Sequence, residues 1–149
     1  MIETRLARRS FLRTSVQAAA VWTAASYSRI YGANEKVNLG LIGAGERGRG
    51  VMSQFVKTGS VEVTAVCDVY AEMIDRAKRT APAAKPYVEY RDLLQQKDLD
   101  AVLIATPDHW HAKMVIDAVD AGKDVYVEKP LCHEIAEGYD IVAAVRRTK

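Results

Sequence analysis

The fold of this chain is decided by residues 37–48, which read Val37-Asn38-Leu39-Gly40-Leu41-Ile42-Gly43-Ala44-Gly45-Glu46-Arg47-Gly48. The first six residues are a mostly apolar run, which is typical of a buried strand. The last six match the pattern G-x-G-x-x-G. Apolar residues at helical spacing follow, at Val51, Met52, Phe55 and Val56. A strand, a glycine-rich turn and a helix in direct succession predict a nucleotide-binding unit.

Each glycine of the motif has a physical reason. Gly43 permits the tight turn, Gly45 lets the backbone approach a pyrophosphate, and Gly48 lets the helix pack closely on the sheet. The helix N-terminus adds free N–H groups and a partial positive charge. We therefore expect the whole hexapeptide, including Ala44, Glu46 and Arg47, to contact the cofactor. The alternative is an ordinary glycine-rich turn.

An acidic residue stands where a dinucleotide site needs one. Residues 61–67 predict a second strand, and Asp68 ends it, 20 residues after Gly48. A carboxylate there can accept both hydrogen bonds of an adenosine ribose diol, and its charge repels a 2′-phosphate. No arginine follows directly, so the sequence favours NAD over NADP. The alternative is that Asp68 only caps the next helix.

Strands and helices continue to alternate along the chain. Further strands are predicted at residues 87–88, 101–105 and 124–127. Helical positions are Tyr70, Ile74, Ala77 and Ala81, then a short helix from Asp92, then Ala112, Val115, Ile116 and Val119, and finally Ile135, Tyr139, Val142 and Val145. This order predicts an α/β fold, a Rossmann-type doubly wound parallel sheet of strand order 3-2-1-4-5. Its ligand should bind at the carboxyl ends of the strands.

The loops after the fourth and fifth predicted strands carry further candidate residues. Thr106 and His111 follow the fourth strand and are expected at the cofactor crevice. His109 and His111 form an H-x-H pair, but no third ligand set with metal spacing accompanies them, so no metal site is predicted. The alternative is that one or both imidazoles cap the helix or face solvent.

The fifth strand is followed by Glu128-Lys129-Pro130. A lysine at the carboxyl end of a central strand points toward the cofactor crevice, where it can polarise a substrate hydroxyl or help to remove its proton. From the tripeptide alone, a surface lysine in a turn forced by Pro130 is the simpler interpretation.

Taken together, these motifs resemble the Gfo/Idh/MocA family of NAD(P)-dependent oxidoreductases over essentially all of residues 36–149. The matching features are the glycine hexapeptide, Cys67-Asp68, Ala105-Thr106-Pro107-x-x-x-His111, Ala121-Gly122-Lys123 and Glu128-Lys129-Pro130. The resemblance implies hydride transfer between NAD and a secondary alcohol of a sugar or cyclitol. It implies that Lys129 is catalytic and that Glu128 lies by the nicotinamide ribose. It also implies that Thr106 and His111 line the nicotinamide end, and that the Lys129–Pro130 peptide is often cis.

Family members carry a second domain that supplies the acid/base histidine, most substrate contacts and usually the oligomer interface. We therefore expect residues 34–149 to be a truncated NAD-binding domain that turns over sugar poorly or not at all by itself. Two alternative functions stay open. One is an NAD-dependent glycosidase that acts through transient oxidation, and the other is a non-catalytic NAD-binding module.

Charge is distributed unevenly along the chain. The first 33 residues carry five arginines and one glutamate, whereas the other 116 carry 16 basic and 18 acidic residues. The mildly acidic body argues against a nucleic-acid partner, and two cysteines exclude a disulfide scaffold.

The front end, residues 1–33, reads as an export signal. Arg8-Arg9-Ser10-Phe11-Leu12-Arg13 and the apolar stretch after it are typical of a twin-arginine signal peptide, with an unclear cleavage site. We therefore expect the twin-arginine translocase as a partner, a periplasmic or otherwise exported location, and no stable membrane anchor. The alternative is an exposed amphipathic helix.

Overall fold

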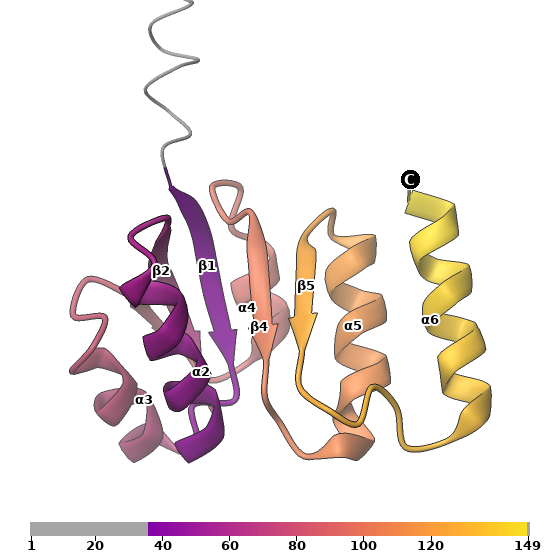
Figure 1. Ribbon diagram of the computed structural model, residues 1–149, viewed down its shortest axis with the longest axis horizontal. Coiled ribbons are helices and arrows are strands. Elements are labelled where there is room, and N and C mark those ends of the chain that lie inside the picture. Colours follow the sequence, from indigo (N-terminus) through magenta and orange to yellow (C-terminus); the bar gives the residue numbers. More distant parts are fainter. Residues whose placement is uncertain (1–35, 149) are drawn as a thin grey trace, which may run out of the picture. The chain divides into compact units, whose positions relative to one another are not determined.

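The computed structural model describes residues 36–148, and the predicted signal at residues 1–33 lies outside them. Five parallel strands form one sheet in the order β3-β2-β1-β4-β5 (Figure 1). The strands are β1 (Val37–Ile42), β2 (Val61–Cys67), β3 (Lys85–Tyr87), β4 (Ala101–Ile104) and β5 (Asp124–Val127). The predicted Rossmann-type α/β fold and its strand order are confirmed.

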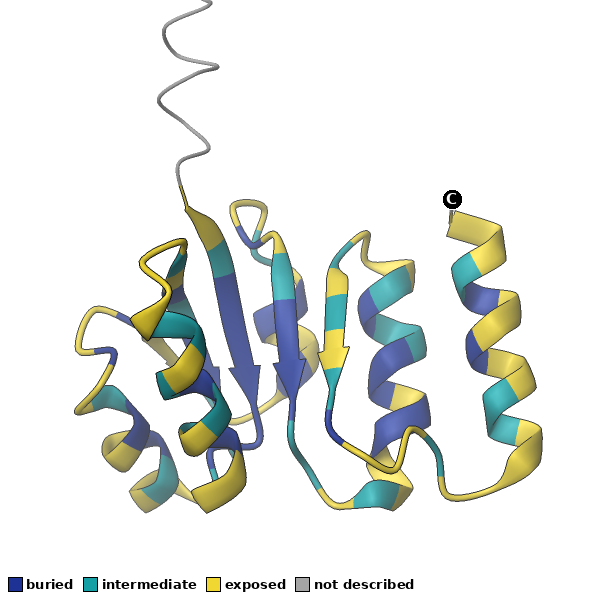
Figure 2. Ribbon diagram, viewed as in Figure 1, coloured by how far each residue is buried: buried dark blue, intermediate teal, exposed yellow. Residues whose placement is uncertain are grey.

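Helices cover both faces of the sheet because successive strand residues point to opposite faces. In β1, Leu39 and Leu41 pack with α2 and α3, whereas Ile42 packs with α4 and α5. Burial is concentrated in β1, β4 and the inner helix faces (Figure 2). The helices are α2 (Glu46–Lys57), α3 (Ala71–Lys78), α4 (Tyr90–Leu94), α5 (His111–Asp120) and α6 (Ile135–Thr148), with a short 3-10 helix η1 (Asp108–Trp110).

The third strand was predicted two residues too late. It spans Lys85–Tyr87, and Val88, which was assigned to it, is 66% exposed. Pro86 made this stretch look like a loop, because proline cannot donate to a ladder. Its place is tolerated because β3 lies at the edge of the sheet and pairs only with β2.

Carboxylate side chains accept backbone N–H groups near two helix starts. The carboxylate of Asp68 accepts the N–H of Tyr70 in the turn before α3, which begins at Ala71 without a side-chain cap, and Tyr70 is 57% exposed rather than packed. The carboxylate of Glu89 accepts the N–H of Arg91, so α4 begins at Tyr90, two residues earlier than predicted. Both are local hydrogen bonds that apolar periodicity does not reveal.

Three of the four residues predicted on the buried face of α6 are exposed. Ile135, Tyr139 and Val142 are 83%, 74% and 46% exposed, whereas the fourth, Val145, is partly buried against the core, and Ile141 and Ala144 are buried. The reason is that α6 packs beside α5, outside the area of the sheet, and so has a single inward face (Figure 1). Between residues 36 and 148, no helix is both long and apolar enough to cross a membrane.

Gly48 offers a test of how tightly α2 packs on the sheet. A methyl group at Gly48 would overlap the carbonyl oxygen of Gly43, whereas one at Gly50, in the same helix, would meet nothing within 4 Å. We expect Gly48→Ala to lower the free energy of unfolding by about 1–3 kcal/mol. Gly50→Ala should raise it by about 0.5–1 kcal/mol. Urea denaturation of both variants measures this, and equal stabilities would contradict the packing described.

Candidate functional site

The loops that follow the parallel strands meet at one edge of the sheet, the lower edge in Figure 1. A cavity of about 360 Å³ opens there. It is lined by Arg47, Ala105, Thr106, Asp108, His111, Glu128 and Lys129. The fold thus brings together Arg47 from the glycine loop and the four candidates from the loops after β4 and β5.

The glycine loop is shaped by two contacts and one open position. Gly43 has a φ of +90°, and a Cβ there would lie 2.7 Å from the carbonyl oxygen of Ala105. Gly48 lies against the carbonyl of Gly43 in the same way. At Gly45, by contrast, a Cβ would meet nothing within 4 Å. Gly43 and Gly48 therefore serve the packing of the protein itself, and Gly45 faces free space.

The N-terminus of α2 has no side-chain cap, because its N-cap residue is Gly45. The first N–H groups of a helix have no acceptor within the helix and carry its positive dipole end. The guanidinium of Arg49 donates a hydrogen bond to the carbonyl oxygen of Ala44 at 2.6 Å, which holds the glycine loop against α2. Open space beside uncapped N–H donors fits the phosphates of a dinucleotide.

Asp68 contacts the glycine loop directly. Its Oδ2 accepts the N–H of Ala44 at 2.7 Å, and its Oδ1 accepts the N–H of Tyr70 at 2.9 Å. An ionised carboxylate offers about four acceptor positions, so two remain for other donors. The acid lies at the end of β2 and holds the glycine loop through Ala44, a contact that the sequence did not predict. The alternative of a helix cap is not what the structure shows, because α3 has no side-chain cap.

Glu128 is a buried acid at the end of β5, with 7% of its surface exposed. Its Oε1 lies 3.0 Å from Nη2 of Arg47, whose side chain is 69% exposed. The hydrogen bond from Arg47 lowers the pKa of Glu128, against the opposing effect of its burial. The pairing joins two candidates that lie 81 residues apart, and neither motif revealed it.

His111 is buried, with 2% of its surface exposed, and its ring joins two loops. Nδ1 lies 2.6 Å from the carbonyl oxygen of Pro130, and Nε2 lies 2.8 Å from that of Thr106. Both ring nitrogens thus contact main-chain carbonyls at the two sides of the cavity. The Lys129–Pro130 peptide bond is cis, as the resemblance implied, and the Lys129 side chain is exposed beside the cavity.

Asp108 also lines the cavity, although it was not among the predicted site residues. Its Oδ1 accepts the N–H of His109 at 2.9 Å, and its Oδ2 lies 3.4 Å from Nδ1 of His133. His133 lowers the pKa of Asp108 by this hydrogen bond. Its place just after β4 was the signal that could have identified it. Within residues 36–148, no group of three or more His, Cys, Asp or Glu side chains could hold a metal ion.

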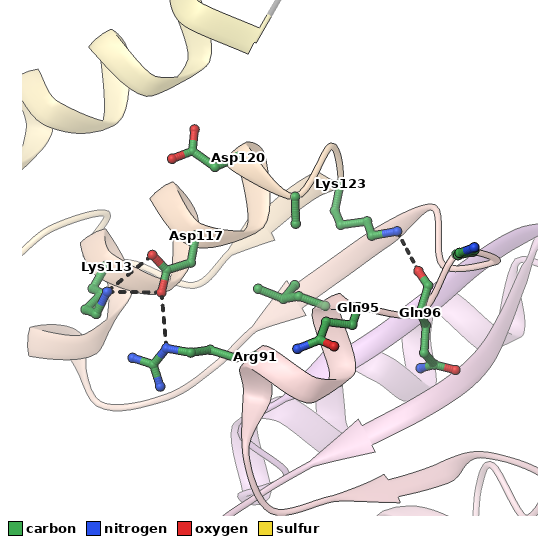
Figure 3. A pocket seen from close by; sticks show the side chains of 10 residues that line it. Arg91, Gln95, Gln96, Lys113, Asp117, Asp120 and Lys123 are labelled. Atoms are coloured by element: carbon green, nitrogen blue, oxygen red, sulfur yellow. Dashed lines mark hydrogen bonds and ion pairs between the residues drawn. The ribbon is translucent and has the colours of Figure 1, made fainter.

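A larger pocket, of about 590 Å³, lies between α4 and α5 and contains none of the predicted site residues (Figure 3). Most of its charged groups are paired within the protein. Lys113 and Arg91 both approach Asp117, at 3.1 and 3.8 Å, and Lys123 donates to the carbonyl of Gln96 at 2.7 Å. Burial would raise the pKa of Asp117, but hydrogen bonds from Tyr90 and Lys113 lower it overall. These contacts hold α4 and α5 together.

Known proteins of similar sequence and similar fold place this chain among its relatives. Over 124 residues the chain is 40% identical to an alpha-N-acetylgalactosaminidase of Shewanella oneidensis, a match that covers 77% of this chain and 27% of that protein. The structure resembles the WlbA dehydrogenase from Bordetella pertussis, solved with NADH and UDP-GlcNAcA. The TM-score is 0.72 and the identity 28%, over 76% of this chain and 34% of that one.

A second solved structure carries the other nicotinamide cofactor. A 3-ketoreductase from Actinomadura kijaniata, in complex with NADP, matches with a TM-score of 0.69 and 26% identity, over 76% of this chain and 36% of that one. The chain thus spans about a quarter of the curated relative and about a third of each solved protein. The family described as "Oxidoreductase family, NAD-binding Rossmann fold" matches residues 37–149. The chain therefore belongs to the Gfo/Idh/MocA oxidoreductase family and comprises its NAD(P)-binding Rossmann domain.

Proposed function

We propose that this chain is the NAD-binding part of an exported enzyme that transfers hydride to or from a secondary alcohol of a sugar or cyclitol. One observation carries the proposal: the uncapped N-terminus of α2, Asp68 and the cavity with Lys129 lie on loops at one edge of the sheet. The WlbA dehydrogenase, with its NADH and sugar nucleotide, supports the substrate class.

In this proposal, three residues of the chain have separate roles at the nicotinamide end of the site. A bound nicotinamide ring would supply the hydride acceptor or donor. Lys129 would donate a hydrogen bond to the reacting hydroxyl oxygen and polarise it, and the hydroxyl proton would pass to the acid/base histidine that the resemblance places in the second domain. Glu128 would accept a hydrogen bond from the nicotinamide ribose. His111 would fix the distance between the loops that carry Thr106 and Lys129, because its ring contacts both.

A second candidate is an NAD-dependent glycosidase in which oxidation of the sugar is transient. The 40% identity to an alpha-N-acetylgalactosaminidase favours it. Both candidates use the same cofactor site and the same lysine, so the products decide between them. Cleavage of a glycosidic bond without net formation of NADH would favour the glycosidase. Accumulation of NADH and an oxidised sugar would favour the dehydrogenase.

Asp68 is expected to set the preference for NAD. Asp68→Ala should weaken NADH binding by about 1–3 kcal/mol, because the ribose loses its acceptor. NADPH binding should weaken less or improve, because the charge that repels the 2′-phosphate is removed. Fluorescence titration of the chain with both cofactors measures the ratio of their affinities.

That ratio separates the ribose role from the loop contact. Loss of the hydrogen bond to Ala44 would disturb the loop for both cofactors alike and leave the ratio unchanged. An unchanged ratio would therefore count against the ribose role. If the unsubstituted chain bound neither NADH nor NADPH, the proposed function itself would be wrong.

Lys129 is expected to serve chemistry rather than cofactor binding. In a protein that contains this chain and has the relatives' full length, Lys129→Ala should reduce kcat about 10²–10⁴-fold. The dissociation constant for NADH should stay within about threefold. The substitution removes an exposed side chain, which leaves the fold intact, and Lys129 is expected to contact the substrate hydroxyl, not the cofactor. Normal turnover by Lys129→Ala would contradict a catalytic role, and an inactive wild type that still binds NADH would favour a non-catalytic module.

Export is proposed from the sequence of residues 1–33. Replacing both Arg8 and Arg9 by lysine should abolish export through the twin-arginine route, since that route reads the arginine pair. Cell fractionation followed by immunoblotting measures the exported share. The matched control replaces Arg5 and Arg29 by lysine and should be exported normally. Full export of the Arg8/Arg9 variant would refute the assignment.

A further inference from the structure

The ion pair between Arg47 and Glu128 crosses the cavity described above. Arg47 is the second residue of α2, in the turn expected to contact phosphate, and Glu128 follows β5. In the sheet, β4 lies between β1 and β5. The 3.0 Å contact therefore reaches from the glycine loop over the end of β4, and both side chains line the cavity.

Glu128 needs this partner because it is buried. An ionised carboxylate removed from water is costly unless a cation or hydrogen-bond donors compensate it. In the part of the chain that the structure describes, Arg47 is the cation within 4 Å of Glu128. The arginine remains 69% exposed, so its own solvation is largely kept, and the contact favours the ionised acid.

We propose that Arg47 is a positioning residue: it holds the Glu128 carboxylate in place and ionised at the cavity wall, and so couples the glycine loop to the nicotinamide end of the site. The inference rests on the proposed function, because it gives Glu128 a cofactor to contact. Arg47 then acts by orienting the Glu128 carboxylate, whereas the sequence motif alone suggested a direct contact with the cofactor. The ion pair uses Oε1 and leaves the carboxylate further acceptor capacity for a ribose hydroxyl.

The charged groups around Glu128 set the expected direction. Arg47 approaches from α2, Lys129 adjoins it on the loop after β5, and Asp108 and His111 line the same cavity from the loop after β4. Arg47 is the largest cause of the lowered pKa of Glu128, and burial acts against it. Without Arg47 the largest cause is lost, and although the backbone hydrogen bond and the charge of Lys129 still lower the pKa, it rises relative to the wild type. The acid then becomes neutral at a higher pH than in the wild type.

The test uses the full 149-residue chain and five variants, of which Glu128→Gln alone serves to assign the NMR signal of Glu128. Arg47→Met removes the cation and keeps the apolar stem, whereas Arg47→Lys restores a positive charge. Arg47→Met combined with Glu128→Gln removes the titrating acid. Arg76→Met is the matched control, because Arg76 is an exposed arginine that pairs with Glu72 on α3. Urea denaturation establishes that each variant is folded before binding is measured.

Two measurements are made on each protein. Carbon-13 NMR of the glutamate δ-carbons, assigned by comparison with Glu128→Gln, follows the titration of Glu128 without cofactor. Calorimetry gives NAD⁺ affinity from about pH 4, below the ordinary range of a glutamate that has lost its partner, up to about pH 8. For Arg47→Met we expect Glu128 to titrate at higher pH, and NAD⁺ affinity to fall about tenfold as the pH drops through that range, because a hydrogen bond to a charged group is lost.

The control variants separate the loss of the Arg47 charge from a general loss of structure. Arg47→Lys should restore much of the wild-type profile, and Arg76→Met all of it. The double variant should bind weakly at every pH, without the added pH dependence. The proposal would be overturned if Glu128 titrated at the same pH in Arg47→Met as in the wild type, or if the loss of NAD⁺ affinity at low pH persisted in the double variant.

If Arg47→Met does not fold, the same comparison is made with Arg47→Lys, whose shorter reach should shift both profiles partway. If the wild type binds no NAD⁺ at any pH, the proposed function fails, and the NMR titration alone decides whether Arg47 positions Glu128.

Discussion

The close approach of α2 to the end of β1 is the constraint on which the rest of the structure depends. The carbonyl of Gly43 lies where any side chain at Gly48 would be, and Gly43 itself touches the backbone of Ala105 at the end of β4. Three backbone segments therefore meet without intervening side chains. This contact brings the positive end of a helix to the edge of the sheet, between β1 and β4, where the strand order reverses.

Further contacts extend from this loop to neighbouring strands. Asp68 connects the loop to the end of β2 through the N–H of Ala44, and Arg47 connects it to the end of β5 through Glu128. His111 then connects the loops after β4 and β5 to each other. Asp68 and Glu128 directly follow strands, whereas His111 is the first residue of α5. The loops at this edge are thus linked to one another as well as to the sheet.

The sequence allowed prediction of what depends on local pattern. The strands at residues 37–42, 61–67 and 124–127, the glycine loop and the position of Asp68 follow from periodicity and motif spacing. What escaped prediction depends on tertiary context. Pro86 reads as a loop residue unless one knows that its strand lies at an edge. The apolar residues on α6 that looked like an inward face are exposed because that helix lies beside α5, beyond the sheet. The contact between Arg47 and Glu128 depends on strand order and side-chain reach, which no short motif encodes.

Under the proposed function, in which Asp68 accepts the ribose hydroxyls, its double attachment also bears on the cofactor preference of this chain. Its charge opposes a 2′-phosphate, but the same carboxylate holds the N–H groups of Ala44 and Tyr70. A change that removes the charge also releases the glycine loop and the turn that begins α3. Acceptance of NADP therefore requires two alterations: a cation near Asp68 to bind the 2′-phosphate, and another acceptor for the N–H of Ala44. An asparagine supplies one carbonyl oxygen and can keep only part of this pairing. Cofactor preference and the order of the phosphate loop are thus linked through one side chain, and selection on either acts on both.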